Sequence, residues 1–466
     1  MRYAVTNSSY KRRMPYSGLS YFLDPFGCAK NQVDAENMMA HLDKAGWEST
    51  PSAESADLII INSCGFIESA KQESINTVIR WRKLYPNKKI LLAGCLAQRY
   101  AKELAENLNE ADGFFGTENI ADIAQAAYKT VKGADTGLEN ITRLPAGKRP
   151  LLSLPGSAYV KISEGCNNRC SYCAIPLIRG GLVSRTIPDI LDECRTLLSR
   201  GIAELCIIGQ DIGSFGTDTA VTAYAVAKLP ELLDAISMIE GQFWVRLLYI
   251  HPDHFPLPIL DIMEKDARFL PYFDIPFQHA STKILSAMNR RGTAKEYLEL
   301  LATIRSRLEH AVIRSTFLLG FPGETEEDFA ALLDFQEKAR LDWLGCFPWS
   351  REENTAAYFM KRRVAKKKAA ARKRIIEERQ IPITEENMNR FAGETLEVLL
   401  EEKFDSSDNE TEETFWLGRL YCQAPDIDGA TVIVGRMTDG KNPQTGSLVR
   451  CRVVTRRGFD LEARLF

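Results

Sequence analysis

The chain has 466 residues, of which 45% are hydrophobic and 26% charged, and its net charge is −3. This length is too great for a single hydrophobic core, so two or three domains are expected. The small net charge gives no overall attraction to nucleic acid or to an anionic membrane, and no apolar run approaches the roughly 20 residues that a membrane helix needs.

Residues 1–20 carry charge but lack the apolar segment and the cleavage site of a secretory signal. We predict that they form a disordered tail and that the protein is cytoplasmic. A reducing cytoplasm disfavours disulfide bonds among the 11 cysteines. The spacing of the cysteines must therefore distinguish inert buried thiols from metal ligands.

From residue 21 to 135 the sequence repeats one pattern three times: a strand-like run ends near a cysteine, and a helical pattern follows. The three cysteines are Cys28, Cys64 and Cys95, each next to a glycine. The pattern predicts an open parallel α/β domain, in which the carboxyl ends of the strands share one edge. We expect the three thiols to converge there and to hold an iron–sulfur cluster with one open iron. Chance or core packing is the alternative.

Core packing is the preferred interpretation for the other isolated cysteines, because they lie inside element patterns and have no partner at ligand spacing. They are Cys194, Cys206, Cys346, Cys422 and Cys451. Residues 136–152 are predicted to be a linker.

Residues 153–388 alternate apolar runs with amphipathic stretches, which predicts a parallel, partly closed (β/α)6 barrel. The predicted strands are Ser157–Ile162, Glu204–Gly209, Phe243–Tyr249, Tyr272–Phe277, Ala311–Gly320 and Trp343–Phe347. Such barrels carry their chemistry at the carboxyl ends of the strands. Polar residues or glycines do follow several strands, where they could bind a ligand or only form turns: Gln210, Asp211, His251, Gln278, His279, Gly320 and Gly323.

Cys166, Cys170 and Cys173 form a C-x3-C-x2-C motif directly after the first of these strands. Three thiolates on one short loop can surround one corner of a metal site, and thiolates favour iron–sulfur clusters or zinc. A closed zinc site takes four ligands, and no fourth ligand is nearby. We therefore prefer a four-iron cluster with one open iron. His251, His254 and His279 lack ligand spacing and are not assigned to a metal.

The C-terminal part begins with a basic, helix-like stretch between residues 350 and 386, which contains KRRVAKKKAAARKR. It could bind RNA, but a solvated helix face is the preferred interpretation. Residues 389–466 show five short alternating strands, which predict a small β-barrel. Residues 390–466 contain 14 acidic and 10 basic residues, a balance that disfavours phosphate binding. The acidic loop Glu401–Glu413, with Asp426 and Asp428, would suit a basic protein partner or only keep the barrel soluble.

The C-x3-C-x2-C motif, with Tyr172 in its aromatic position, resembles the signature of the radical S-adenosylmethionine (SAM) superfamily. The resemblance implies that the open iron binds the methionine end of SAM, and that reductive cleavage of SAM produces a 5′-deoxyadenosyl radical. Tyr172, Gln210 and Gly320 are then the expected cofactor contacts. Tyr172 would pack near the adenine or shield the cluster from solvent.

The motifs GCAKNQVDAE, NSCGFIESAKQES and GCLAQRY resemble those of the methylthiotransferase family, and the C-terminal barrel resembles a TRAM domain. The stretch KNQVDAE after Cys28 is similar to the RimO branch, which modifies a ribosomal protein. The tRNA-modifying MiaB branch typically has Gln-Met-Asn there. Ala29 and Ser63 depart from the proline and threonine usual in the RimO branch.

The resemblance implies two 4Fe-4S clusters, held by the two sets of three cysteines, and two SAM molecules. It also implies an electron donor such as a flavodoxin or ferredoxin, and a methylthio group inserted at the β-carbon of an aspartate in ribosomal protein S-twelve. Two alternatives are a tRNA adenosine methylthiotransferase with the same chemistry and a non-catalytic, zinc-stabilised RNA-binding scaffold.

Overall fold

A computed structural model of the chain describes residues 16, 18–133, 147–219, 226–404, 414–435 and 443–465. The chain divides between Pro150 and Leu151 into two compact units. Arg149, in the predicted linker, is buried and donates to the Glu36 carboxylate at 2.7 Å. The end of that segment therefore belongs to the first unit.

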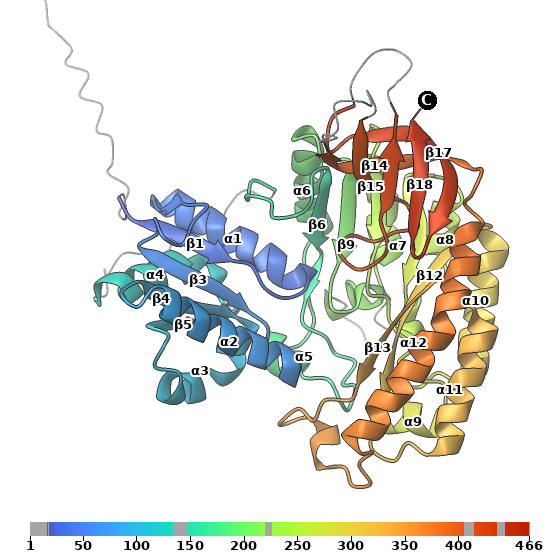
Figure 1. Cartoon of the computed structure of the whole chain (residues 1–466), viewed down its shortest axis with the longest axis horizontal. Helices are drawn as coiled ribbons and strands as arrows, with labels where there is room; N and C mark the ends of the chain where they lie inside the picture. Colours follow the sequence, from blue (N-terminus) through green and yellow to red (C-terminus); the bar gives the residue numbers. More distant parts are fainter. Residues whose placement is uncertain are drawn as a thin grey trace, which may run out of the picture. The chain divides into compact units, whose positions relative to one another are not determined.

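The first unit contains a five-stranded sheet in the order β2-β1-β3-β4-β5, with every pair parallel (Figure 1). Its strands are β1 (Ser20–Asp24), β2 (Glu48–Ser49), β3 (Leu58–Ser63), β4 (Lys89–Gly94) and β5 (Gly113–Phe115). Its helices are α1 (Ala29–Ala45), α2 (Glu68–Leu84), α3 (Cys95–Asn107), the short η1 (Ile120–Asp122) and α4 (Ile123–Lys132).

Alternating side chains of β3 belong to two hydrophobic cores, one on each face of the sheet. Leu58 and Ile60 share a core with residues of α1 and α4, whereas Ile59 and Ile61 share one with residues of α2 and α3. Burial on both faces explains the unbroken apolar sequence of this strand. Tyr16 is also buried in the first core and β1 begins at Ser20. The remaining residues of the predicted tail before residue 18 lie outside the described residues.

The second unit begins with a six-stranded sheet in the order β13-β12-β11-β10-β9-β6, which leaves β6 and β13 at the edges. Its strands are β6 (Ser157–Lys161), β9 (Glu204–Ile208), β10 (Trp244–Leu247), β11 (Phe269–Asp274), β12 (Val312–Leu319) and β13 (Trp343–Pro348). All neighbouring strands are parallel. The predicted partly closed parallel barrel is therefore confirmed.

Helices cover one face of this sheet and share a large hydrophobic core with it. They include α6 (Ile187–Ser199), α7 (Leu229–Ser237), α8 (Ile259–Met263), α10 (Ala294–Arg307) and α11 (Glu326–Ala339). The smaller elements and the last helix are β7 (Ser163–Glu164), α5 (Ile175–Arg179), β8 (Val183–Ser184), η2 (Ile212–Ser214), η3 (Thr217–Thr219), η4 (Pro252–His254), α9 (Thr282–Ala287), η5 (Ala356–Phe359) and α12 (Lys366–Asn389).

The predicted bounds of one barrel strand were wrong. The strand expected at Tyr272–Phe277 is β11, which begins three residues earlier and includes Pro271. Its pairing with β10 shifts register between Val245 and Leu247, which face Phe269 and Phe273. Proline lacks an N–H for the ladder and is tolerated at such an irregularity.

The C-terminal residues form a closed five-stranded barrel in the order β14-β15-β16-β18-β17, as predicted. Its strands are β14 (Thr395–Phe404), β15 (Phe415–Leu420), β16 (Thr431–Val434), β17 (Leu448–Arg457) and β18 (Asp460–Leu465). Closure leaves no free strand edge.

One segment of this small barrel, residues 419–428, contacts every strand of the six-stranded sheet near its amino end. Each contact comes from one of the first four residues of the strand. The contacts are Tyr159 with Asp426 (3.4 Å), Glu204 with Arg419 (2.5 Å), Arg246 with the Tyr421 carbonyl (2.8 Å), Tyr272 with Asp428 (2.6 Å), Arg314 with Asp428 (3.5 Å) and Trp343 with the Cys422 carbonyl (2.7 Å).

The sequence predicted that Asp428 offers its negative charge at the surface, to a basic partner or for solubility, and this prediction is wrong. Its side chain is 1% exposed, and Oδ2 accepts hydrogen bonds from the Tyr272 hydroxyl and the Ala424 amide. Its charge is therefore used inside the fold. Asp426 is exposed. Residues 405–413 of the acidic loop lie outside the described residues.

We expect Glu204→Gln to lower the free energy of unfolding by about 3–5 kcal/mol at neutral pH, because two buried guanidinium groups lose their shared counter-charge. Glu204 accepts from Arg246 at 2.7 Å and from Arg419 at 2.5 Å. Burial alone would raise the pKa of Glu204, but Arg419 and Arg246 outweigh it and lower the pKa to about 2.

Because the folded pKa of Glu204 lies below its ordinary value of 4.5, this stabilisation is present above about pH 4.5 and is lost as the pH falls toward 2. Denaturant unfolding of both proteins at several pH values checks this. The difference in free energy should shrink on acidification, and a difference independent of pH would contradict it.

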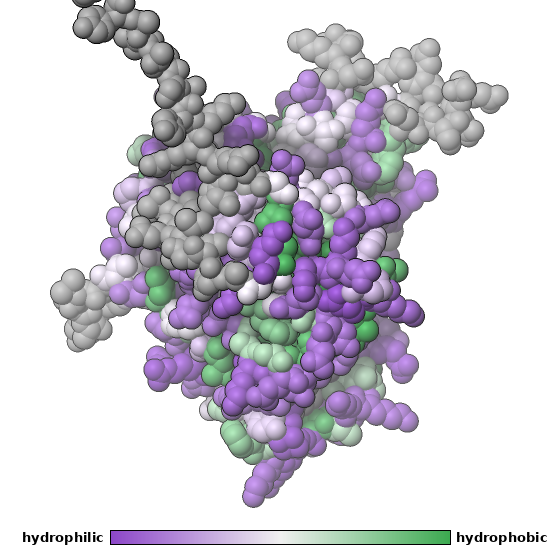
Figure 2. Space-filling view, turned by 90° about the vertical axis from the view of Figure 1, so that its left-hand side faces the viewer, coloured by the Kyte–Doolittle hydropathy of each residue, from purple (hydrophilic) through white to green (hydrophobic). Residues whose placement is uncertain are grey.

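Hydrophilic side chains predominate on the face drawn in Figure 2, with hydrophobic residues scattered among them. Within the described ranges, no helix combines the length and apolar content required to cross a membrane.

Candidate functional site

The three cysteines of the first unit follow β1, β3 and β4, which are consecutive neighbours in the sheet. Cys28 precedes the first residue of α1, Cys64 directly follows β3, and Cys95 is the first residue of α3. All three cysteines therefore lie at the carboxyl edge of the sheet, whereas the gathering of their thiols around one cluster stays a prediction. Two of the thiols lie at helix N-termini, where the helix dipole favours a negative charge.

Asn31 connects these three cysteine loops. It lies in the first turn of α1 and is 1% exposed. Its side-chain amide donates to the Ser63 carbonyl at 2.8 Å, and its Oδ1 accepts from the Cys95 thiol at 3.1 Å. Asn62 donates to the Asn31 carbonyl at 2.8 Å. The loops are thus held in place by protein contacts, as a preorganised ligand site requires.

Two of the glycines beside these cysteines lie where a side chain would collide with neighbouring residues. A Cβ at Gly65 would lie 2.7 Å from the Cys95 carbonyl oxygen. A Cβ at Gly94, where φ is +95°, would lie 2.5 Å from Asn62 Oδ1. Both glycines let neighbouring strand ends approach each other closely.

The second set of cysteines lies on the loop after β6, between β7 and α5. Cys166, Cys170 and Cys173 are each half-buried. Burial raises the pKa of Cys166 to about 11 and that of Cys173 to about 12, and the charge of Cys170 adds to both increases. The thiols are close enough to repel one another as thiolates. Ligation must therefore release protons and supply positive charge, as a metal cluster does.

Contacts from other strand-end loops hold this cysteine loop. Asn168 donates to the Asp211 carboxylate at 2.8 Å, and Asn289 donates to the Arg169 carbonyl at 2.9 Å. His254 Nε2 lies 2.9 Å from Asn168 Oδ1. Asp211, for which the sequence indicated a turn or a ligand contact, and His254, which was not assigned a role, therefore both act on the loop.

A buried arginine beside this loop was missed by the sequence analysis. Arg290 donates to the Tyr172 hydroxyl at 3.2 Å and to the Pro276 carbonyl at 2.6 Å. It lowers the pKa values of Cys166 and Cys173, against the larger effect of burial. Tyr172 packs against a small apolar cluster that includes Met288.

The predicted cofactor contact Gln210 lies next to the cysteine loop with an unsatisfied oxygen. Its amide donates to Glu164 at 2.8 Å, while its buried Oε1 and the buried Ser163 Oγ have no hydrogen-bond partner among the described residues. Burial would raise the pKa of Glu164, but Lys161 and Arg179 lower it to about 2. Unpaired buried oxygens near an ionised carboxylate fit a polar, cationic ligand such as SAM.

A cleft of about 570 Å³ adjoins the loop and is lined by Asn168, His251 and Arg291, among others. His251 Nδ1 accepts from the Asp253 amide, and its buried Nε2 has no partner among the described residues. Burial lowers the pKa of His251 to about 3, so the imidazole is neutral. Among the described residues, no three His, Cys, Asp or Glu side chains are grouped so that they could hold one metal ion.

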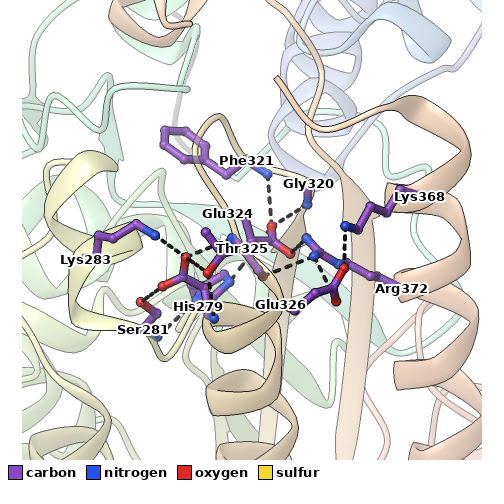
Figure 3. Close-up of polar contacts among 11 residues, drawn as sticks. His279, Ser281, Lys283, Gly320, Phe321, Glu324, Thr325, Glu326, Lys368 and Arg372 are labelled. Carbon is purple, nitrogen blue, oxygen red and sulfur yellow. Dashed lines mark hydrogen bonds and ion pairs between the residues drawn. The ribbon is translucent and has the colours of Figure 1, made fainter. Parts of the chain in front are cut away.

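The turn after β12 is stabilised by Glu324, which the sequence analysis also missed (Figure 3). Its Oε2 accepts from the Gly320 amide at 2.5 Å and from the Phe321 amide at 3.1 Å. Arg372 of α12 donates to Glu324 Oε1 at 2.5 Å and to the Thr325 carbonyl at 3.1 Å. Helix α12 is thereby fixed to the carboxyl end of β12.

His279 lies on the other side of this turn. Its Nδ1 accepts from the Ser281 amide at 3.0 Å, and its buried Nε2 is 4.0 Å from Glu324 Oε2. Burial lowers the pKa of His279 to about 3. A neutral imidazole cannot form an ion pair, so Arg372 supplies the counter-charge of Glu324.

Packing accounts for Gly320, whose predicted contact with the cofactor stays a prediction. Its φ is +72°, its amide is bound to Glu324, and a Cβ there would lie 2.5 Å from Ala369 Cβ in α12.

We expect Gly320→Ala to destabilise the protein by about 1–3 kcal/mol more than Gly323→Ala, because of overpacking. Both glycines have positive φ, but no atom lies within 4 Å of a Cβ at Gly323. Denaturant unfolding of the two variants separates the collision with α12 from backbone strain. Equal losses of stability would rule the collision out.

Three family models match the chain. Residues 20–116 match the uncharacterized protein family UPF0004, residues 160–335 the radical SAM superfamily and residues 392–465 the TRAM domain. The chain is 46% identical to ribosomal protein uS12 methylthiotransferase RimO of Treponema denticola, over 95% of this chain and 99% of that one. It is 37% identical to the protein of the same name from Aquifex aeolicus, over 94% and 95%.

The chain belongs to the RimO family. Membership disfavours both the tRNA-modifying alternative and the non-catalytic scaffold, and the radical SAM domain of this RimO family member implies a 4Fe-4S cluster and SAM. Among solved structures, the radical SAM methyltransferase TsrM of Kitasatospora setae is similar, with a TM-score of 0.55 and 16% identity over 73% of this chain and 77% of that one. This likeness supports the fold alone.

Proposed function

We propose that this protein inserts a methylthio group at the β-carbon of an aspartate in ribosomal protein uS12 (S-twelve). The observation that carries the proposal is the presence, in one RimO family chain, of two three-cysteine sites at carboxyl ends of parallel strands. Each site offers three thiols, which leaves one iron of a four-iron cluster open.

In this proposal Cys166, Cys170 and Cys173 hold the cluster that binds SAM, and Cys28, Cys64 and Cys95 hold a second one. The bound groups would supply a carbon radical and a methylated sulfur, chemistry that side chains cannot provide. Gln210 would accept a hydrogen bond from the cofactor, and Tyr172 would shield it. Asn31 and Arg290 would fix the two cysteine sites.

The proposed substrate is part of the ribosome, so a cytoplasmic location follows. Cleavage of SAM also needs one electron at a time from a donor such as a flavodoxin or ferredoxin. The protein's own residues would bind and orient the reactants and keep water away from the radical.

The test is anaerobic reconstitution with iron and sulfide, followed by addition of SAM and a reductant. We expect about eight irons per chain and, by mass spectrometry, a gain of one sulfur and one CH₂ on uS12. The gain should be absent from tRNA treated in parallel. A colourless protein with bound zinc would exclude the clusters, and a gain confined to tRNA would exclude the substrate.

A further inference from the structure

The basic stretch before and within α12 consists of two parts, which differ in whether their cations form ion pairs with acidic residues. Its later cations have acidic partners: Lys368 with Glu326, Arg372 with Glu324, Lys373 with Glu377 and Arg374 with Glu378. Its earlier cations are exposed and form no ion pair within the described part of the chain; we call Lys361, Arg362, Arg363, Lys366 and Lys367 the basic patch. The unneutralised charge is therefore confined to the start of α12 and the loop before it.

The basic patch lies beside the C-x3-C-x2-C loop. The Ala357 amide donates to the Ser171 carbonyl at 2.8 Å, and Tyr172 packs with Ala357 and Met360 in one apolar cluster. On the other side, the Gly323 amide donates to the Arg362 carbonyl at 2.9 Å. In Figure 1 the segment between β13 and α12, drawn in orange, lies where the arrow of β13 points. The patch therefore lies at the carboxyl end of the barrel.

Two exposed aromatic rings occur near this segment. Phe359 lies on it and is 74% exposed, and Phe347, near the end of β13, is 48% exposed. Arg351 lies over the Tyr358 ring at 3.9 Å. Large apolar rings bordered by charges are typical of protein contact surfaces, where aromatic residues supply much of the binding energy.

We infer that the basic patch, with Phe359, is the docking surface for a small acidic flavodoxin that reduces the three-cysteine site. Opposite charges would speed the encounter of the two proteins. Electron transfer slows steeply with distance, and the segment that leads into the patch is hydrogen-bonded to the cysteine loop through the Ala357 amide. At each encounter the reduced flavin loses one electron and the cluster gains it, with no bond made or broken.

RNA would need a longer unneutralised stripe to follow successive phosphates. The ion pairs along α12 end the free charge after Lys367. A compact patch fits a small protein better. The inference depends on the proposed cluster at Cys166, Cys170 and Cys173, but not on the proposed substrate.

The test variant is Arg363→Glu/Lys366→Glu/Lys367→Glu in the full chain. Glutamates in the first turn of α12 suit the helix dipole, so folding is preserved. The matched control is Lys265→Glu/Arg450→Glu/Arg452→Glu, which reverses three exposed cations elsewhere in the second unit. Lys265 precedes β11, and Arg450 and Arg452 lie in β17 of the small barrel, which contacts the amino ends of the sheet strands.

The readouts are the rate of anaerobic cluster bleaching with reduced flavodoxin, without SAM or substrate, and the binding of flavodoxin. We expect the patch variant to react at least about tenfold more slowly at low salt and to lose most of its salt dependence. Dithionite, which needs no docking, should reduce wild type, variant and control at equal rates. The control should also match wild type with flavodoxin.

An unchanged flavodoxin rate in the patch variant would overturn the inference. So would an equal slowing with dithionite, or a variant that keeps the flavodoxin rate but no longer binds a single-stranded RNA probe. A protein that binds no iron would instead refute the proposed cluster. The two failures are therefore distinguishable.

Discussion

Replacing Cys170 by alanine is expected to reduce 5′-deoxyadenosine formation from SAM to background. Three thiolates are the minimum that fixes a four-iron cluster with one open iron, and the loop has no other cysteine than Cys166 and Cys173. The loop itself should persist, because Asn168 and Asn289 hold it through neighbouring groups. Chromatography of the nucleoside products after anaerobic reconstitution measures the effect.

The control for Cys170→Ala is Cys451→Ala, which removes a buried thiol from the C-terminal barrel. This control should retain cleavage of SAM. Cleavage by the Cys170 variant at a tenth or more of the wild-type rate (an order-of-magnitude threshold for ligand loss) would argue against ligation by this cysteine.

Cys95→Ser should stop insertion of the methylthio group and spare cleavage of SAM. Serine keeps a donor for Asn31 Oδ1, which the Cys95 thiol contacts at 3.1 Å, so the loops should stay in register. A hydroxyl is a hard, protonated group and a poor ligand for iron in a cluster. The iron content should fall from about eight to about four per chain.

Mass spectrometry of uS12 and quantification of 5′-deoxyadenosine in the same reaction check the Cys95→Ser prediction. Insertion that persists in this variant would mean that the two cysteine sites do not divide the reaction as proposed. Loss of both products would mean that the first site also supports cleavage.

The sequence predicted the three folded parts because their signals are local and periodic. Alternation of apolar strands with helical patterns was sufficient for the parallel sheets, and short alternating runs for the small barrel. Strand bounds failed at β11, which includes Pro271, because the irregular pairing with β10 tolerates a proline there. Local pattern cannot reveal such a register shift.

The candidate cysteines were also predictable, because spacing and repetition survive in the one-dimensional sequence. Their supporting residues were not. Asn31, Arg290 and Glu324 act through partners 32 or more residues away in the sequence or through backbone groups. Asp428 was misjudged for the same reason: its acidic turn is typical of an exposed surface, yet Tyr272 and Arg314 enclose it.

Through residues 419–428, the small barrel contacts all six parallel strands and closes the amino end of the large barrel. Removal of residues 390–466 would expose Arg246 and Glu204 to solvent, although both side chains are 0% exposed in the full chain. In a truncated protein, loss of the small barrel's own function would therefore be indistinguishable from destabilisation of the large barrel. The same contacts restrict evolution, because either barrel can be replaced only if the residues on both sides of this interface change together.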